Sequence, residues 1–214
     1  AVGSFTDETQ YVTIANSYGV YKTDVRNHQR IGAFAIASDG KQMQQASNSY
    51  GGNYDISYYE NFDFVPFAKE AAISAVESLD AEEMVGGVYD VVIHNAFGGV
   101  IFHEACGHSL EATSVARGMS VFCGKMGQKI ASDIVTAVDD GTIYNEWGST
   151  NIDDEGNPTK KNVLIKDGVL TGYMIDDRNS RIMGMPSTGN SRRQNYRYSP
   201  TSRMTNTYIA NGTS

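Results

Sequence analysis

Three Asp-Gly pairs, at residues 39–40, 140–141 and 167–168, constrain the fold of this chain more than any other feature. Each pair stands between two segments that contain apolar residues, and Asp-Gly in that setting is a strong signal for a tight β-hairpin. A two-residue turn can join only antiparallel neighbours, so the sequence predicts antiparallel sheets. Strands are also predicted at residues 11–15 and 31–37, where apolar residues cluster.

The clearest helix is predicted at residues 64–79, where apolar side chains recur at helical spacing. Asp63 precedes it as a suitable N-cap, and Pro66 falls in the first turn, where proline is tolerated. A short apolar run at residues 88–93 predicts a buried strand, and a second helix is predicted at about 100–113.

Residues 47–62 are predicted to form a loop or an irregular edge, and residues 149–161 are predicted to form a long polar turn. The order of elements is then strands, helix, strand, helix and strands. That order indicates an α+β fold, in which a few helices pack on antiparallel sheets.

The composition is that of a globular domain protein. The chain has 214 residues, of which 40% are hydrophobic and 20% charged, which excludes a disordered tail or a coiled coil. No run of about 18 apolar residues is present to span a membrane. Two cysteines are too few for a disulfide scaffold, so a reducing, cytoplasmic location is predicted. The first residue is alanine and no signal segment follows, so we expect a fragment or a processed chain.

Charge is distributed unevenly along the chain. Residues 178–214 carry six arginines and no acidic residue, whereas residues 1–177 carry 25 acidic and 11 basic residues. The basic end could bind an anion, or its arginines could pair with the acidic stretch before them. The net charge of −8 argues against direct nucleic-acid binding, although a nucleic-acid regulator is kept as one alternative.

The sharpest local signal is HEACGH at residues 103–108. Zinc peptidases commonly carry H-E-x-x-H, in which the two histidines are four residues apart; here they are five apart. Positions i and i+5 of a regular helix point about 140° apart, so both rings could not face one ion. A π-turn closes i to i+5 and would bring them together, and Gly107 makes such a deformation easier. We therefore predict a π-bulge or a break in this helix.

Several residue types around this turn suit metal-dependent hydrolysis. Glu104 could serve as the general base beside two neutral imidazoles. Glu111 could ligate the metal, or hold a histidine ring from behind. Cys106 and Cys123 are interpreted as small core residues. The alternative is a structural fragment whose two histidines serve only in packing.

A family resemblance runs in order from about residue 95 to 209, and more weakly from 11 to 90. The residues that carry it are HEACGHSLEA, GMSVFCGKMGQKIAS, VDDGTI, GSTNIDDEGNPTKKNVLIKDGVLTGYM, GMPSTGNSRR and RMTNTY. These segments resemble the TldD branch of the TldD/PmbA family. The resemblance implies a zinc metallopeptidase with an H-E-x-x-x-H motif, which hydrolyses peptides or unfolded segments in peptide maturation or degradation.

The same resemblance implies residue roles and partners. His103 and His108 would be zinc ligands and Glu104 the general base. A PmbA/TldE-like paralogue, or a second copy, would be the protein partner, with no direct nucleic acid and no membrane. The family's label as a modulator of DNA gyrase is an indirect one.

The family's third zinc ligand is a cysteine that follows the segment matching RMTNTY, and this sequence stops at Ser214. We therefore expect an incomplete zinc site and little activity in this fragment. Residues 1–90 are expected to end an N-terminal α/β domain. Residues 91–214 are expected to hold the motif helix and the start of a β-rich C-terminal domain whose later part is missing.

Four polar residues near the C-terminus are candidates for contacting substrate or a tetrahedral oxyanion: Arg192, Arg193, Arg203 and Asn206. Each arginine could instead form only a surface ion pair. An extended peptide is expected to bind by adding a strand to an exposed sheet edge. The main alternative function is a non-catalytic, peptide-binding subunit of a TldD/PmbA-type complex.

Overall fold

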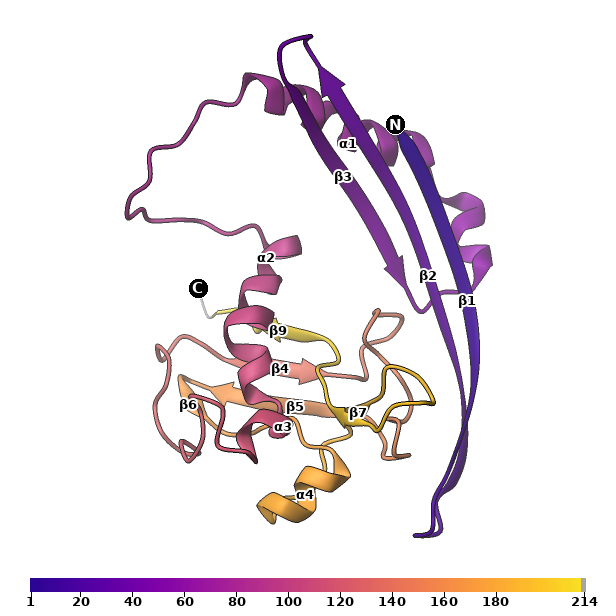
Figure 1. Ribbon diagram of the computed structural model, residues 1–214, viewed down its shortest axis with the longest axis vertical. Helices are drawn as coiled ribbons and strands as arrows, with labels where there is room; N and C mark the ends of the chain where they lie inside the picture. The colour runs from indigo at the N-terminus through magenta and orange to yellow at the C-terminus, as the bar shows by residue number, and fades with distance from the viewer. Residues whose placement is uncertain (213–214) are drawn as a thin grey trace. The chain divides into compact units, whose positions relative to one another are not determined.

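The computed structural model describes residues 1–212, with the side chains of residues 96–97 left aside. The chain divides into two compact units (Figure 1). The first comprises Ala1–Gln10 and Val25–Val92, and the second comprises Tyr11–Asp24 and Ile93–Ser214. The two elements that cross this division are strands β1 (Val2–Ala15) and β2 (Tyr21–Ser38).

The first unit is built on a three-stranded sheet in the order β1-β2-β3, with β3 at Met43–Gly52. Strands β2 and β3 pair antiparallel from Ser38↔Met43 to Gln29↔Gly52, which confirms the hairpin predicted at residues 39–40. The turn is held by the Asp39 carboxylate, which accepts hydrogen bonds from the backbone N–H groups of Lys41 and Gln42. These contacts keep the pKa of Asp39 below its usual value.

Helix α1 (Phe64–Glu77) confirms the predicted amphipathic helix and continues into a short 3-10 turn at Ser78–Asp80. The Asp63 side chain caps it by accepting from the Val65 N–H. The helix packs on one face of the sheet (Figure 1) through a small core of buried alanines, with Phe67 packed against them: Ala33, Ala35, Ala71 and Ala75. Small residues on both elements let the helix approach the sheet closely.

Residues 47–62 are predicted to form a loop or an irregular edge; the first part does lie at a sheet edge, and the loop is wrong in part. Residues 47–52 complete β3, and Ile56–Asn61 form a 3-10 helix, η1, capped by Asp55. The polar Ser and Asn residues are accepted in β3 because it is an edge strand with one side exposed. Aromatic stacking holds the segment after it, with ring centroids of Tyr54 and Tyr58 only 4.0 Å apart.

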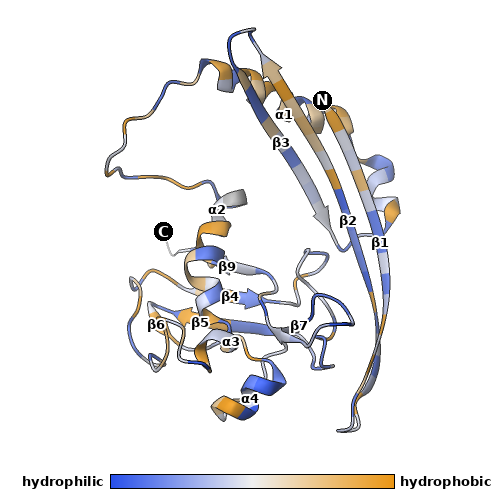
Figure 2. Ribbon diagram, in the orientation of Figure 1, coloured by the Kyte–Doolittle hydropathy of each residue, from blue (hydrophilic) through white to orange (hydrophobic). Residues whose placement is uncertain are grey.

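The buried strand predicted at residues 88–93 is also wrong. Residues 81–94 lie outside all helices and strands of the described chain, and Val88 and Val92 are fully exposed. Figure 2 shows hydrophobic residues along this segment. A strand needs a neighbour to take its backbone hydrogen bonds, and among residues 1–212 no strand pairs with this segment.

The second unit contains a four-stranded antiparallel sheet in the order β6-β5-β4-β9. Its strands are β4 (Ala137–Asp140), β5 (Lys161–Lys166), β6 (Val169–Leu170) and β9 (Thr207–Ile209). A two-stranded ribbon joins β7 (Ser191–Arg192) to β8 (Thr201–Ser202), and α4 spans Asp177–Met183. The core includes the fully buried side chains of Leu110, Leu164, Leu170 and Met174.

Of the two hairpins predicted in this unit, one is confirmed. Asp167 and Gly168 both adopt positive φ angles, 49° and 79°, and connect β5 to β6 in a tight turn. The hairpin predicted around residues 140–141 is wrong, because β4 pairs with β5 and β9 instead. The Asp140 carboxylate accepts from the backbone and hydroxyl of Thr142, so the chain turns there without starting a strand.

Residues 149–160 form the predicted polar turn, organised by Asp153, whose carboxylate accepts from the backbone of Glu155 and Asn157. The fold class is α+β, as predicted, with helices packed against antiparallel sheets. Within the described residues, no helix is long and apolar enough to cross a membrane.

Candidate metal centre

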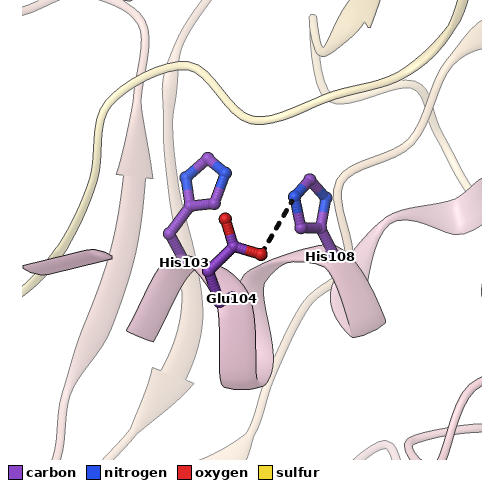
Figure 3. A group of neighbouring side chains, drawn as sticks. All are labelled: His103, Glu104 and His108. Atoms are coloured by element: carbon purple, nitrogen blue, oxygen red, sulfur yellow. Dashed lines mark ion pairs between the residues drawn. The ribbon is translucent and has the colours of Figure 1, made fainter. Parts of the chain in front are cut away.

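The predicted distortion of the motif helix is confirmed. Helix α2 (Asn95–Phe102) leads into one π-helical turn, η3 (His103–Gly107), and then a 3-10 turn, η4 (His108–Leu110). The His108 N–H donates to the His103 carbonyl, which is the i to i+5 bond of a π-turn. The two imidazole rings therefore lie on one side of the helix, with centroids 4.7 Å apart and planes at 89° (Figure 3).

Glu104 lies between the two histidines (Figure 3). Ligand atoms of His103, Glu104 and His108 all lie within 4.8 Å of one another, and Glu104 Oε2 is 3.9 Å from His108 Nε2. Within residues 1–212, no other three His, Cys, Asp or Glu residues are grouped this closely. The Glu104 side chain is 67% exposed, so solvent and substrate can reach it.

Gly107 has a steric reason to be glycine. A Cβ atom at this position would collide with the sulfur of Met204, which is itself buried. The backbone of Gly107 is helical, so a positive φ angle does not explain the glycine. The lack of space for a side chain beside Met204 does. The sequence suggested that Gly107 eases the π-turn, and the structure adds that it admits a side chain from a distant segment.

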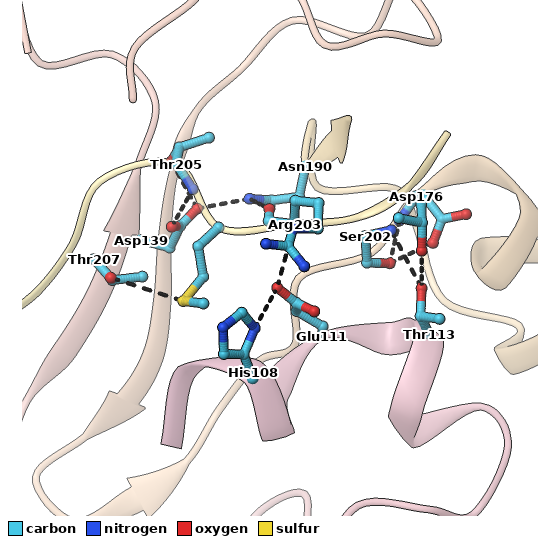
Figure 4. Close-up of polar contacts among 12 residues, drawn as sticks. His108, Glu111, Thr113, Asp139, Asp176, Asn190, Ser202, Arg203, Thr205 and Thr207 are labelled. Carbon is cyan, nitrogen blue, oxygen red and sulfur yellow. Dashed lines mark hydrogen bonds and ion pairs between the residues drawn. The ribbon is translucent and has the colours of Figure 1, made fainter. Parts of the chain in front are cut away.

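The chain leaves the helical path at Glu111, whose backbone is extended before the short helix α3 (Ala112–Val115). This break is fixed by backbone bonds with Met174, which donates to the Leu110 carbonyl and accepts from the Ala112 N–H. The Glu111 carboxylate is thereby turned back toward the motif. Its Oε1 lies 3.2 Å from His108 Nδ1 and 3.8 Å from Arg203 Nε (Figure 4).

Glu111 therefore contacts the nitrogen of His108 that faces away from Glu104. Its side chain is only 8% exposed, and this burial raises the pKa of Glu111. The positive charges of Arg203 and His108 oppose that rise. This is the contact that the second of the two predicted roles requires, in which Glu111 holds a histidine ring from behind; both roles stay predictions.

Burial lowers the pKa of His103, and the neighbouring charge of His108 lowers it further. The negative charge of Glu104 acts in the opposite direction, and Arg203 and Arg192 again favour the neutral ring. A neutral imidazole is the form that binds a metal ion, so this environment suits a ligand at neutral pH.

The four predicted substrate-contacting residues have different surroundings. Arg203 faces Glu111, and the charge of Arg192 also reaches Glu111 and His103. Burial, followed by the charge of Arg203, lowers the pKa of Arg192. Arg193 instead donates from its backbone and its guanidinium to Asp154, in the acidic polar turn.

Asn206 uses its amide inside the protein. It donates to the Asp140 carbonyl and to the Ser149 hydroxyl, and its oxygen accepts from the Gly148 N–H. In this arrangement it closes the turn between residues 140 and 149. The sequence did not indicate this role.

Three further residues near the site escaped sequence reasoning: Asp139, Asn190 and Thr205. The fully buried Asp139 carboxylate accepts from the Asn190 amide and from the backbone and hydroxyl of Thr205 (Figure 4). Burial raises the pKa of Asp139, and these hydrogen bonds oppose the rise. The sequence did offer one signal for Asp139, namely two adjacent acids at the end of an apolar strand. The prediction of a hairpin there interpreted both acids as part of a turn.

Neither cysteine belongs to the group of possible metal ligands formed by His103, Glu104 and His108. Cys106 is partly buried against the core, and burial raises the pKa of its thiol. The Cys123 sulfur contacts the Val115 carbonyl at 3.4 Å.

The donor set fits a zinc ion. Two imidazoles on one side of a turn with an adjacent carboxylate is the arrangement that catalytic zinc sites use, with a further ligand and solvent completing the shell. His108 also has the carboxylate partner on its other nitrogen that metal-ligating histidines commonly have.

Comparison with known proteins places the chain in a family. Residues 1–79 match the PmbA/TldA metallopeptidase central domain, and residues 86–214 match the PmbA/TldA metallopeptidase C-terminal domain. The chain is 41% identical to a metalloprotease TldD homolog of Haemophilus influenzae, over 95% of this chain and 43% of that protein. It is 37% identical to the TldD homolog of Buchnera aphidicola from Acyrthosiphon pisum, over 99% of this chain and 45% of that protein.

Solved structures share the fold. A candidate DNA gyrase modulator of Thermotoga maritima aligns with a TM-score of 0.83 at 22% identity, over 98% of this chain and 46% of that one. TldE from Thermococcus kodakarensis aligns with a TM-score of 0.72 at 23% identity, over 99% and 46% of the two chains. The chain thus spans less than half the length of the relatives it matches. With nearly all of its residues matched to two successive family domains, the chain belongs to the PmbA/TldA metallopeptidase family, also called TldD/PmbA.

Proposed function

We propose that this chain carries the catalytic turn of a zinc-dependent metallopeptidase that hydrolyses peptides or unfolded segments. The observation that carries the proposal is the π-turn, because it brings atoms of two imidazoles and one exposed carboxylate within 4.8 Å of one another. The TldD relatives, which are named metalloproteases, support the reaction class.

In this proposal His103 and His108 hold the zinc ion. Zinc, when bound, supplies a Lewis acid that polarises the scissile carbonyl and acidifies a water molecule. Glu104 accepts the proton of the attacking water and later gives it to the leaving nitrogen. Glu111 holds the His108 ring through Nδ1, so that Nε2 stays on the side of Glu104 and His103.

A catalytic zinc ion usually has three protein ligands. The family resemblance implies that the third ligand is a cysteine that follows the segment matching RMTNTY. Of the two cysteines in the described residues, Cys106 packs on the core and Cys123 contacts Val115. On this proposal the isolated 214-residue chain binds zinc weakly and cleaves little. Intact protein is therefore the material to test.

The substrate is proposed to bind as an extended strand. In the second unit, β9 is an edge of the four-stranded sheet, and it packs beside the π-turn. Strand addition there would recognise the backbone of a peptide with little demand on its sequence. The charges of Arg192 and Arg203 both reach the motif. Because Arg203 faces Glu111, Arg192 is the arginine that is better placed than Arg193 to meet a developing negative charge.

The protein partner is proposed to be a TldE-like paralogue or a second copy, in the cytoplasm, with no direct role for nucleic acid. The structural likeness to TldE supports a shared fold for such a pair. A non-catalytic peptide-binding subunit is the alternative, and it would not need Glu104.

The test is Glu104→Gln in the intact protein. We expect zinc content to stay at the wild-type level and cleavage of an unfolded peptide to fall by at least about 100-fold, the usual contribution of a general base. Glu83→Gln, which removes an exposed acid elsewhere, should change neither. Unchanged cleavage by the Glu104→Gln variant would remove Glu104 from the reaction and favour the non-catalytic alternative.

A further inference from the structure

His108 of the motif is connected through Glu111 to Arg203, the first residue of the segment Arg203–Thr205. The Arg203 guanidinium approaches Glu111 Oε1 at 3.8 Å, and the same oxygen lies 3.2 Å from His108 Nδ1 (Figure 4). In Figure 4, Glu111 lies between Arg203 and His108. Among the described residues, the Glu111 carboxylate is thus the group that links Arg203 to His108.

The backbone of Arg203 is fixed on both sides by Asn190. The Arg203 N–H donates to the Asn190 carbonyl at 2.8 Å, and the Asn190 side-chain amide donates to the Arg203 carbonyl at 3.1 Å. The Asn190 amide also donates to Asp139 Oδ2 at 2.6 Å. One buried asparagine therefore ties the backbone of Arg203 to the Asp139 carboxylate.

Asp139 holds the other end of the segment. Its carboxylate accepts from the Thr205 N–H at 2.7 Å and from the Thr205 hydroxyl at 2.8 Å, and it is completely buried. Between these anchors, Met204 packs where a Cβ atom of residue 107 would otherwise lie. The segment therefore touches the motif turn twice, at Gly107 and at Glu111.

We propose that Arg203 is a positioning residue for the metal site, that it acts through Glu111 on the His108 ring, and that buried Asp139 anchors it there. The inference rests on the proposed zinc site. A carboxylate at Nδ1 favours the ring form that carries its hydrogen on Nδ1 and leaves Nε2 free to bind a cation. Arg203 contacts that carboxylate from a backbone held by Asn190, and so keeps it in place beside His108.

The test is a double-mutant cycle read as zinc affinity in the intact protein, by competition with a chromophoric chelator and without substrate. We expect Glu111→Gln to weaken zinc binding by about 10- to 100-fold, the usual effect of removing such a partner. Arg203→Ala should weaken it by about tenfold, again within that range. The double variant should bind zinc no more weakly than Glu111→Gln alone, because the proposed route from Arg203 to the His108 ring runs through Glu111.

Additive losses in the double variant would overturn the proposal, and so would unchanged zinc affinity in Arg203→Ala. Arg203→Lys keeps a positive charge near Glu111 and should lose less affinity than Arg203→Ala, which separates positioning from a failure to fold. Arg178→Ala removes an exposed arginine of α4 and should leave zinc affinity unchanged.

Peptide kinetics separate this role from direct substrate binding. If Arg203 instead bound the peptide, Arg203→Ala would raise KM and leave the zinc affinity unchanged, which would refute the positioning role. Asp139→Asn should weaken zinc binding, whereas Asp140→Asn, whose carboxylate accepts hydrogen bonds from Thr142, should not. A wild-type protein that bound no zinc would refute the proposed function itself. If wild type bound zinc and Arg203→Ala bound it equally well, only this inference would be refuted.

Discussion

At the residue scale, the site depends on a missing side chain as much as on those present. Gly107 leaves room for the Met204 sulfur directly under the motif turn. The sequence showed the glycine and the need for an unusual turn, because the spacing of two histidines is local information. It could not show Met204, which lies almost a hundred residues later and meets Gly107 only in the folded chain.

Replacing Gly107 by alanine should therefore destabilise the protein by about 1–3 kcal/mol, as overpacking of a filled core does. The measurement is the free energy of unfolding in urea. Gly99→Ala is the matched control, because Gly99 lies in helix α2 with open space around it. That change should stabilise by about 0.5–1 kcal/mol through helix propensity. Equal effects of the two substitutions would refute the steric explanation.

His103 gives a prediction on pH in the metal-free protein. Burial and the nearby His108 charge lower its pKa below the ordinary value of 6.5, so the unfolded chain binds the proton more readily than the folded one. The contribution of His103 is present above pH 6.5 and is lost as pH falls through that value toward the lower folded pKa. The His103→Gln variant should lose less unfolding free energy than wild type between pH 7.5 and 5.5. A larger loss would contradict the assigned direction.

At the scale of elements, local signals succeeded where the partner was close in sequence. The turn at residues 39–40, the helix at 64–77 and the hairpin at 167–168 depend on capping and turn chemistry within a few residues. The predicted hairpin at 140–141 failed because β4 takes its partners from Lys161–Lys166 and Thr207–Ile209 instead. Strand pairing is long-range, so hydrophobic pattern alone could not choose between neighbours.

The segment at residues 81–94 also shows that an apolar pattern alone does not determine whether a strand forms. Val88→Ser and Val92→Ser should each change the free energy of unfolding by less than about 0.5 kcal/mol, because both side chains are fully exposed. Val138→Ser is the control, since Val138 lies buried in β4 and should cost at least about 1.5 kcal/mol. A loss at Val88 as large as that at Val138 would show that this segment is a buried strand, as its sequence predicts.

At the scale of the whole molecule, the sequence revealed the metal-binding motif but not the distant residues that hold it in place. The sequence predicted that His103, Glu104 and His108 would form one group, and the structure brings their ligand atoms within 4.8 Å. The support comes from residues 139, 190 and 203–205, which converge only through the sheet and its connections. Asp139 and Asn190 among them are polar and buried, a combination that composition and periodicity do not reveal.

The most direct test of the central claim is X-ray absorption at the zinc edge of the zinc-loaded intact protein. Two imidazole nitrogens should appear at about 2.0–2.1 Å from the metal, and one should remain in His108→Ala. A wild-type spectrum with fewer than two imidazoles would mean that His103 and His108 do not share an ion, and the metallopeptidase proposal would fail.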